Sequence, residues 1–227
     1  MNVLAAAWLI ARKDLRVEWR SRELIYTTLF FAIACVLVFS FAFVREDGRP
    51  IENAAAGILW VAIAFSGTLA LGRTFERERQ AETLRALLLA PVERASIYLG
   101  KLLALLALLV GIEVLLVPIV GFLFQAPMLR APWLLAALVL AGTVGFAVVG
   151  TLFAAMLVRA QSRDVLLPVV LYPLTVPVII AGVRGTGAIF AVEPNLPMAQ
   201  TWLAMLVSFD VVFLTVALWT FAPVMRD

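Results

Sequence analysis

The chain has 227 residues, of which 64% are hydrophobic and 15% are charged, and its formal net charge is +3. A soluble domain is typically about half apolar and about a quarter charged, so this composition excludes an ordinary soluble globule and predicts an integral membrane protein. The small net charge is scattered along the chain, which excludes a nucleic-acid-binding protein.

Two residue types restrict the chemistry. The chain has no histidine, which removes the commonest metal ligand and the usual acid–base group near neutral pH. It has one cysteine, Cys35, inside an apolar run, so no disulfide can form within the chain. We therefore predict no catalytic residue and no metal site, because neither a Ser-His pair nor an HExxH zinc site can be built.

Residues 3–22 are predicted to form an amphipathic helix in the membrane interface. The apolar residues recur every three or four positions, at Leu4, Trp8, Ala11, Leu15 and Trp19. Basic residues occupy mostly the opposite side, at Arg12, Lys13, Arg16 and Arg20. Plain juxtamembrane positive charge is the alternative, but the two tryptophans favour the interfacial helix. The charges follow the first apolar segment, so we expect no cleaved signal peptide.

Six apolar runs are long enough to cross a bilayer as helices of about 20 residues. They cover residues 24–44, 53–72, 102–124, 133–158, 165–183 and 201–223. The predicted fold is therefore an all-α integral membrane protein, with residues 1–227 forming one six-span domain.

The distribution of basic residues predicts the orientation of the spans. Fourteen of the 18 Lys and Arg residues fall on one side of the predicted spans. Because basic residues concentrate on the cytoplasmic side, both termini are expected in the cytoplasm. The connections on the other side, around residues 45–52, 125–132 and 184–200, are too short to form a domain.

The largest predicted cytoplasmic feature is residues 73–101, which include a charged and leucine-rich block. Leu84, Leu87 and Leu88 lie near one helical face, and Pro91 ends that helix. A leucine face outside the membrane must be covered, either by the bilayer surface or by a cytoplasmic partner. We favour the partner and assign the coupling role to Phe75, Glu76, Arg77, Glu78, Glu82, Leu84, Leu87, Leu88 and Pro91.

The same block contains no P-loop. Gly100-Lys101 is the nearest approach, but Ala95 replaces the first glycine of the motif and Leu102 replaces its hydroxyl residue. We therefore expect no ATPase activity in this chain, and any energy from ATP must come from another polypeptide.

Two carboxylic acids, Glu113 and Asp210, fall near the middle of predicted spans. An ionised carboxylate there costs roughly 2.5–3.5 kcal/mol on insertion scales, so such residues often mark a pathway. The alternative is a protonated carboxyl group that is hydrogen-bonded to a neighbouring helix. The pair keeps a proton-coupled secondary transporter as a rival function.

Three prolines, Pro168, Pro173 and Pro177, interrupt the fifth span. Each removes a backbone donor, so the sequence predicts a bent helix, with a moving gate as the alternative.

Two segments resemble one family. "WVAIAFSGTLALGRTFERERQAETLRALLLAPVERASIYLGK" (residues 60–101) and "LVRAQSRDVLLPVVLYPLTVPVIIAG" (residues 157–182) are similar to the corresponding regions of the CcmB family. That family supplies the membrane permease of the ABC transporter in cytochrome c maturation. Length and the six-span layout also agree. One departure is Gln80-Ala81-Glu82, where many relatives carry a glycine after the acidic block.

The resemblance implies an ABC exporter permease-like fold in the cell inner membrane. It implies two permease copies with the cytoplasmic ATPase CcmA, which binds ATP and Mg²⁺, and a wider complex with CcmC, CcmD and the haem carrier CcmE. No cofactor is expected on this chain, and haem belongs to the wider complex. Because polar residues are few in the spans, mechanical coupling is favoured over haem passage, and a scaffold subunit that transports nothing is the alternative.

Overall fold

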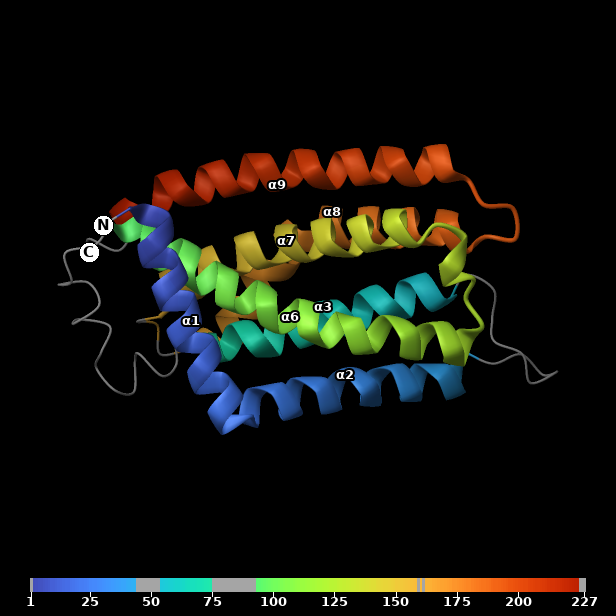
Figure 1. Ribbon diagram of the computed structural model, residues 1–227, viewed down its shortest axis with the longest axis horizontal. Helices are drawn as coiled ribbons and strands as arrows, with labels where there is room; N and C mark the ends of the chain where they lie inside the picture. Colours follow the sequence, from blue (N-terminus) through green and yellow to red (C-terminus); the bar gives the residue numbers. More distant parts are fainter. Residues whose placement is uncertain (1, 44–53, 75–92, 159, 161, 225–227) are drawn as a thin grey trace.

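The computed structural model of the protein describes residues 2–43, 54–74, 93–158, 160 and 162–224. Figure 1 shows the helices and their labels, which are used below. They are α1 (Val3–Ser21), α2 (Glu23–Ala42), α3 (Ala54–Thr74), α6 (Arg94–Phe124), the 3-10 turn η1 (Met128–Arg130), α7 (Pro132–Met156), α8 (Arg163–Phe190) and α9 (Leu196–Val224).

The prediction of an all-α membrane protein is confirmed. Within the described ranges, six helices are long and apolar enough to cross a membrane, namely α2, α3, α6, α7, α8 and α9. They run lengthwise beside one another, and α1 crosses the bundle obliquely at one end (Figure 1).

The two central helices are α3 and α7. In the apolar 18-residue stretch that could span a membrane, 67% of the residues of each of these helices are buried, compared with 17% for α2 and 11% for α9. The outer helices therefore expose large apolar side chains such as Phe41 and Trp219, as expected of surfaces that face lipid.

A tryptophan holds three helices of the core together. Trp60 of α3 is 1% exposed, and its indole lies against Gly142 of α7 and Gly182 of α8, where an added Cβ would collide with the ring. The indole Nε1 donates to Thr186 Oγ1 at 3.2 Å. The two glycines thus provide the space that a large aromatic ring needs in a close-packed interior.

Three helices extend beyond the predicted spans. α6 begins at Arg94, where the sequence predicted 102–124, and its first two turns contain the buried Lys101. α8 continues to Phe190, beyond the predicted 165–183, because Gly185 and Thr186 are buried in the bundle. α9 begins at Leu196, with Pro197 in its first turn, where a missing backbone N–H removes no helical bond.

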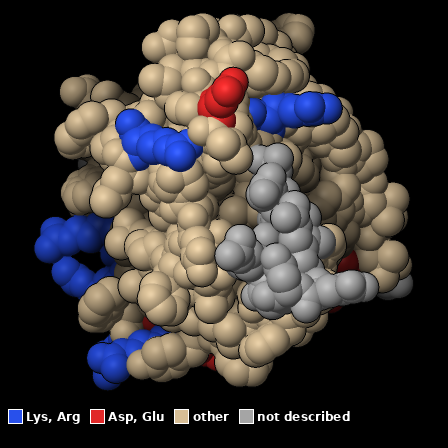
Figure 2. Space-filling view, turned by 90° about the vertical axis from the view of Figure 1, so that its right-hand side faces the viewer, with Lys and Arg blue, Asp and Glu red and all other residues tan. Residues whose placement is uncertain are grey.

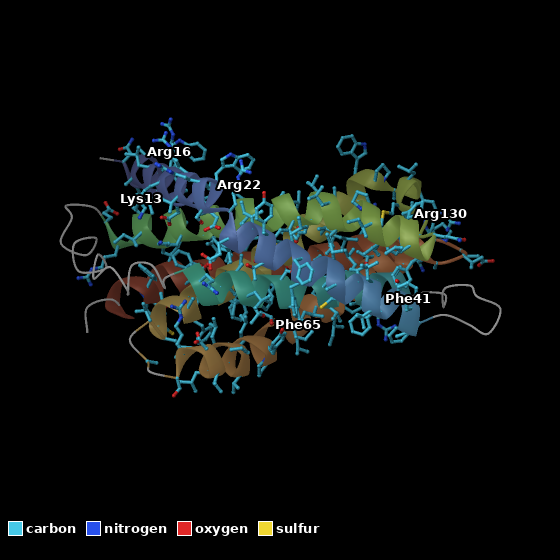
Figure 3. All side chains as sticks on the ribbon, turned by 90° about the horizontal axis from the view of Figure 1, so that it is seen from below. Lys13, Arg16, Arg22, Phe41, Phe65 and Arg130 are labelled. Atoms are coloured by element: carbon cyan, nitrogen blue, oxygen red, sulfur yellow. The ribbon has the colours of Figure 1, made fainter. Side chains whose placement is uncertain are left out.

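The described charges concentrate at the end of the bundle that carries α1. Figure 3 shows Lys13, Arg16 and Arg22 at this end. Figure 2 views the opposite end, where the described residues form a mainly uncharged surface with isolated charged side chains. There Arg130 Nη1 donates to the carbonyl oxygen of Ala191, which ties the α6–α7 connection to the end of α8.

Candidate functional site: the charged end of the bundle

The predicted coupling residues lie outside the described part of the chain. They are Phe75, Glu76, Arg77, Glu78, Glu82, Leu84, Leu87, Leu88 and Pro91. The helices that flank them are described: α3 ends at Thr74 and α6 begins at Arg94, both at the end where α1 crosses (Figure 1). The assignment of a coupling role to these residues stays a prediction.

Helix α1 packs against the first turns of α6 through small residues. Ala6, Ala7 and Ala11 are at most 2% exposed. An added Cβ at Gly100 would lie 2.7 Å from Cβ of Ile10 and 2.9 Å from the carbonyl oxygen of Ala7. Gly100 therefore allows the two helices to approach closely, which gives this glycine a packing role.

An ion pair fixes the same contact. Lys101 Nζ lies 2.8 Å from Asp14 Oδ2, and the lysine side chain is 2% exposed. Asp14 Oδ1 also lies 3.0 Å from Lys13 Nζ. Because a buried ammonium group needs a close counter-charge, the Asp14–Lys101 pair fixes the position of α1 on α6.

Two further polar contacts join helices at this end. Arg163, 3% exposed at the start of α8, donates from Nη2 to the carbonyl oxygen of Leu71 in α3 at 3.0 Å. Near the end of α3, Arg73 Nη1 lies 3.4 Å from Oε1 of Glu23, which is at the start of α2. At the end of the bundle that flanks the predicted coupling residues, polar contacts thus join α6 to α1, and α3 to both α2 and α8.

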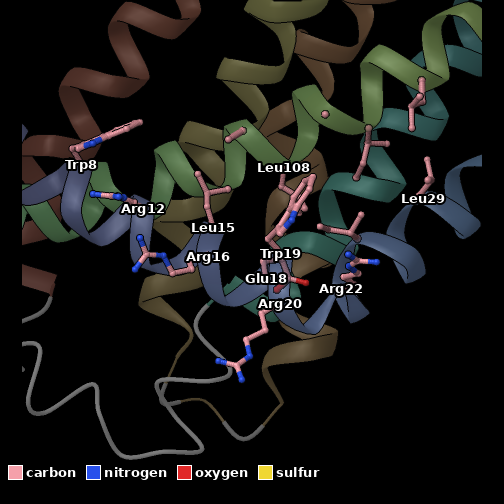
Figure 4. Close-up of a pocket in the computed structure, with 15 residues that line it drawn as sticks. Trp8, Arg12, Leu15, Arg16, Glu18, Trp19, Arg20, Arg22, Leu29 and Leu108 are labelled. Atoms are coloured by element: carbon pink, nitrogen blue, oxygen red, sulfur yellow. The ribbon is translucent and has the colours of Figure 1, made fainter.

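A groove opens beside α1, between α2 and α6 (Figure 4). Its volume is about 970 Å³. The α1 side carries Arg12, Arg16, Arg20 and Arg22 with Trp8 and Trp19. The sequence predicts Arg12, Arg16 and Arg20 mostly on the side of the helix opposite the tryptophans, and the structure corrects this, because both kinds of side chain line the same groove. The groove itself could not be predicted, because its opposite wall includes α6, about 90 residues along the chain.

The two predicted membrane carboxyl groups both contact α7. Glu113 of α6 is 5% exposed, and Thr143 Oγ1 donates to its Oε1. Asp210 of α9 packs at Gly145, where an added Cβ would lie 2.6 Å from Asp210 Oδ1. Glu113 thus accepts a hydrogen bond from a neighbouring helix. The role of the two acids, as part of a pathway or as structural groups, stays a prediction.

The three predicted prolines lie in one helix. α8 runs without interruption from Arg163 to Phe190 through Pro168, Pro173 and Pro177. Thr175 Oγ1 between them donates to the carbonyl oxygen of Leu171 at 3.0 Å. Their role as a bend or a gate stays a prediction.

Comparison with known proteins gives a consistent result. Residues 5–227 match the family model described as "CcmB protein". The chain is 32% identical over 212 residues to "Heme exporter protein B" of Paracoccus denitrificans, covering 92% of this chain and 93% of that protein. It is 30% identical over 200 residues to the protein of the same name in Pseudomonas aeruginosa, covering 87% of each.

A third relative matches over a shorter stretch. "Heme exporter protein B" of Escherichia coli is 32% identical over 97 residues, which cover 43% of this chain and 44% of that protein. The family match extends over nearly the whole chain, and two of these relatives are covered over most of their length. This multi-pass membrane protein belongs to the CcmB family.

Proposed function

We propose that the chain is the membrane subunit of an ATP-driven haem exporter complex that acts in cytochrome c maturation. In this proposal a cytoplasmic ATPase hydrolyses ATP, and the chain converts the resulting motion into haem delivery or into release of a haem-loaded carrier. Family membership and the name of the relatives, "Heme exporter protein B", support this function.

The observation that carries the coupling proposal is the linked, charged end of the bundle. Residues 75–92 connect α3 to α6, and both flanking helices are joined there to their neighbours. The Asp14–Lys101 pair links α6 to α1, and the bond from Arg163 links α3 to α8. A force applied to the connecting segment would therefore reach several helices of the bundle together.

The complex follows from the same proposal. The ATPase is CcmA, which holds ATP and Mg²⁺, and the chain itself holds no cofactor. CcmC, CcmD and the haem carrier CcmE complete the assembly, with two copies of the permease. The protein lies in the cell inner membrane with both termini in the cytoplasm, an orientation supported by the concentration of basic residues around α1.

The packing of polar groups favours mechanical coupling over passage of haem through this chain. Several buried hydroxyl groups donate to carbonyl oxygens of their own helix: Ser66 to Ala62, Thr175 to Leu171 and Thr186 to Gly182. The hydrogen of each of these hydroxyl groups is therefore used within its own helix and is not available to an amphipathic substrate. The buried Glu113 and the half-buried Asp210 are the residues that favour the proton-coupled alternative.

Co-purification tests the coupling proposal. Leu87→Asp places a carboxylate in the proposed ATPase interface, and a buried unpaired charge costs about 3 kcal/mol or more. We expect ATPase recovery with the tagged chain to fall by about tenfold or more, with membrane insertion unchanged. Glu193→Lys, at the opposite end of the bundle, is the control and should retain the ATPase. Normal recovery with Leu87→Asp would refute docking at this segment.

A further inference from the structure

The groove beside α1 combines a basic rim with an apolar interior. The rim carries Arg12, Arg16, Arg20 and Arg22. Arg12, Arg16 and Arg20 form no ion pair with another described residue, and Arg22 Nη1 donates a 3.4 Å hydrogen bond to the hydroxyl group of Tyr26. The one acidic residue in the lining is Glu18, whose Oε1 accepts the backbone N–H of Leu24 at 3.0 Å. The rim therefore has an excess of positive charge.

The interior walls come from two membrane-spanning helices. The side chains that α2 and α6 contribute are aliphatic: Ile25, Leu29, Leu108, Ile112 and Leu115. Trp19 of α1 and Leu108 of α6 both line the groove (Figure 4). At Gly111 of α6 an added Cβ would meet no atom within 4 Å, so the wall leaves open space there.

The basic rim and the apolar interior together determine which kind of ligand the groove can bind. Guanidinium groups bind phosphate through charge-assisted hydrogen bonds, and aliphatic walls stabilise hydrocarbon by excluding water. A soluble anion would use only the rim, and a neutral lipid only the walls. The volume of about 970 Å³ lies at the upper end of the roughly 300–1,000 Å³ typical of ligand pockets.

We infer that the groove between α1, α2 and α6 is a binding site for an anionic phospholipid. The phosphate lies against the α1 arginines, and an acyl chain follows the aliphatic wall of α2 and α6. Basic grooves beside membrane helices recognise anionic headgroups in this way. The bound lipid joins α1 to the bundle on the side away from its alanine contact with α6. This inference concerns the chain alone and does not depend on an ATPase partner.

Lipid-dependent stability of the purified full-length chain tests the site. In detergent, phosphatidylglycerol should raise the thermal unfolding temperature, and phosphatidylcholine with the same acyl chains should have a smaller effect. Arg16→Gln with Arg20→Gln should weaken the phosphatidylglycerol response on the order of tenfold in lipid concentration, because each basic residue contributes about 1 kcal/mol to binding anionic lipid. Arg184→Gln, exposed on another part of the bundle, is the matched control and should respond as the unmodified chain does.

A second variant tests the apolar half without removing charge. Gly111→Leu fills the open space in the wall, whereas Val114→Leu changes an exposed position of the same helix that does not line the groove. Gly111→Leu should reduce the amount of phosphatidylglycerol that native mass spectrometry detects on the chain, and Val114→Leu should not. Unfolding of each variant without added lipid separates lost binding from lost folding.

Three outcomes would overturn the inference. Equal stabilisation by the two lipids would mean that the headgroup charge is not recognised. Equal stabilisation by inorganic phosphate would identify a soluble anion as the ligand. An unchanged lipid response in both the arginine double variant and Gly111→Leu would place the lipid elsewhere on the protein.

Discussion

Lys101 shows how one residue can hold a helix at the edge of the bundle. Its side chain is 2% exposed and lies 2.8 Å from Asp14 Oδ2. Removal of one partner from a buried pair leaves an uncompensated charge, and the cost reaches about 3–5 kcal/mol when both groups are fully buried. Because the Asp14 side chain is 19% exposed, we expect Asp14→Ala to lower the free energy of unfolding by about 1–3 kcal/mol.

A double-mutant cycle separates this pair from general damage to α1. Lys101→Met with Asp14→Ala removes both charges and retains a long apolar side chain, so the double variant should lose less stability than the sum of the single variants. Thermal unfolding in detergent provides the measurement. Strictly additive losses would show that the two charges do not stabilise one another.

Glu113 allows the proton-coupled alternative to be tested at a single position. Thr143 Oγ1 donates to Glu113 Oε1, and a glutamine can accept the same bond through its amide oxygen but cannot release a proton. Under mechanical coupling we expect Glu113→Gln to keep most of the cytochrome c maturation activity. Glu113→Leu, which leaves the Thr143 hydroxyl group without its acceptor, should destabilise the chain by about 1–3 kcal/mol.

The Gln variant is decisive because folding and proton release are measured separately. Thermal unfolding reports whether α6 still packs on α7, and a haem-staining assay of c-type cytochromes reports function. A folded Glu113→Gln protein without activity would favour the proton-coupled transporter over the proposed coupling role.

At the scale of the helices, the contact of α3 with α7 and α8 depends on space left by two glycines. Trp60 fills that space, so Gly182→Ala should push the indole out of its position and lower stability by about 1–3 kcal/mol. Gly187→Ala on the same helix is the matched control, because its added Cβ would meet only Ala56, at 3.9 Å. Thermal unfolding of both variants provides the comparison, and equal losses would show that contact with Trp60 is not the cause.

The existence of the helices could be predicted, because length and hydropathy determine which segments can span a bilayer. The residues at which the helices begin and end were harder to predict from the sequence. The sequence predicts Lys101 as a charged residue between two spans, and its pairing with Asp14 of α1 makes it a buried residue of α6 instead of part of a loop. Its position on the cytoplasmic side stays a prediction. Such a pairing requires contact between residues far apart in sequence, which helical periodicity does not report.

The contact face of α1 illustrates the same limit. The spacing of Leu4, Trp8 and Trp19 predicts a helix with an apolar stripe, and α1 spans Val3–Ser21. Trp8 and Trp19 remain 59% and 72% exposed, while Ala7 and Ala11 are buried. The sequence therefore predicted the helix but not the small-residue face that packs on α6: it assigned Ala11 to the stripe with the tryptophans, whereas Ala11 is buried with Ala7. Contact of the exposed tryptophans with lipid stays a prediction.

For the molecule as a whole, the two ends of the bundle differ in charge and in what they connect. One end carries α1, the Asp14–Lys101 pair and the groove, and the chain between α3 and α6 joins it there. The other end carries short described connections, such as the one between Phe190 and Leu196. Among the described residues, this asymmetry fits the proposed subunit, which is driven from the end that carries α1.

Cysteine accessibility tests that orientation. Cys35 is the chain's one cysteine, so a Cys35→Ala background allows single reporters to be placed. Ser162→Cys lies in the exposed turn between α7 and α8 at the charged end, and Glu193→Cys lies in the exposed connection between α8 and α9 at the opposite end. Because basic residues are retained on the cytoplasmic side, a membrane-impermeant maleimide added to intact cells should label Glu193→Cys and not Ser162→Cys.

After the membrane is permeabilised, both cysteines should react with the maleimide, which controls for burial of the thiol. The reverse pattern would place α1 and the segment between α3 and α6 outside the cytoplasm, beyond the reach of any ATP-hydrolysing partner.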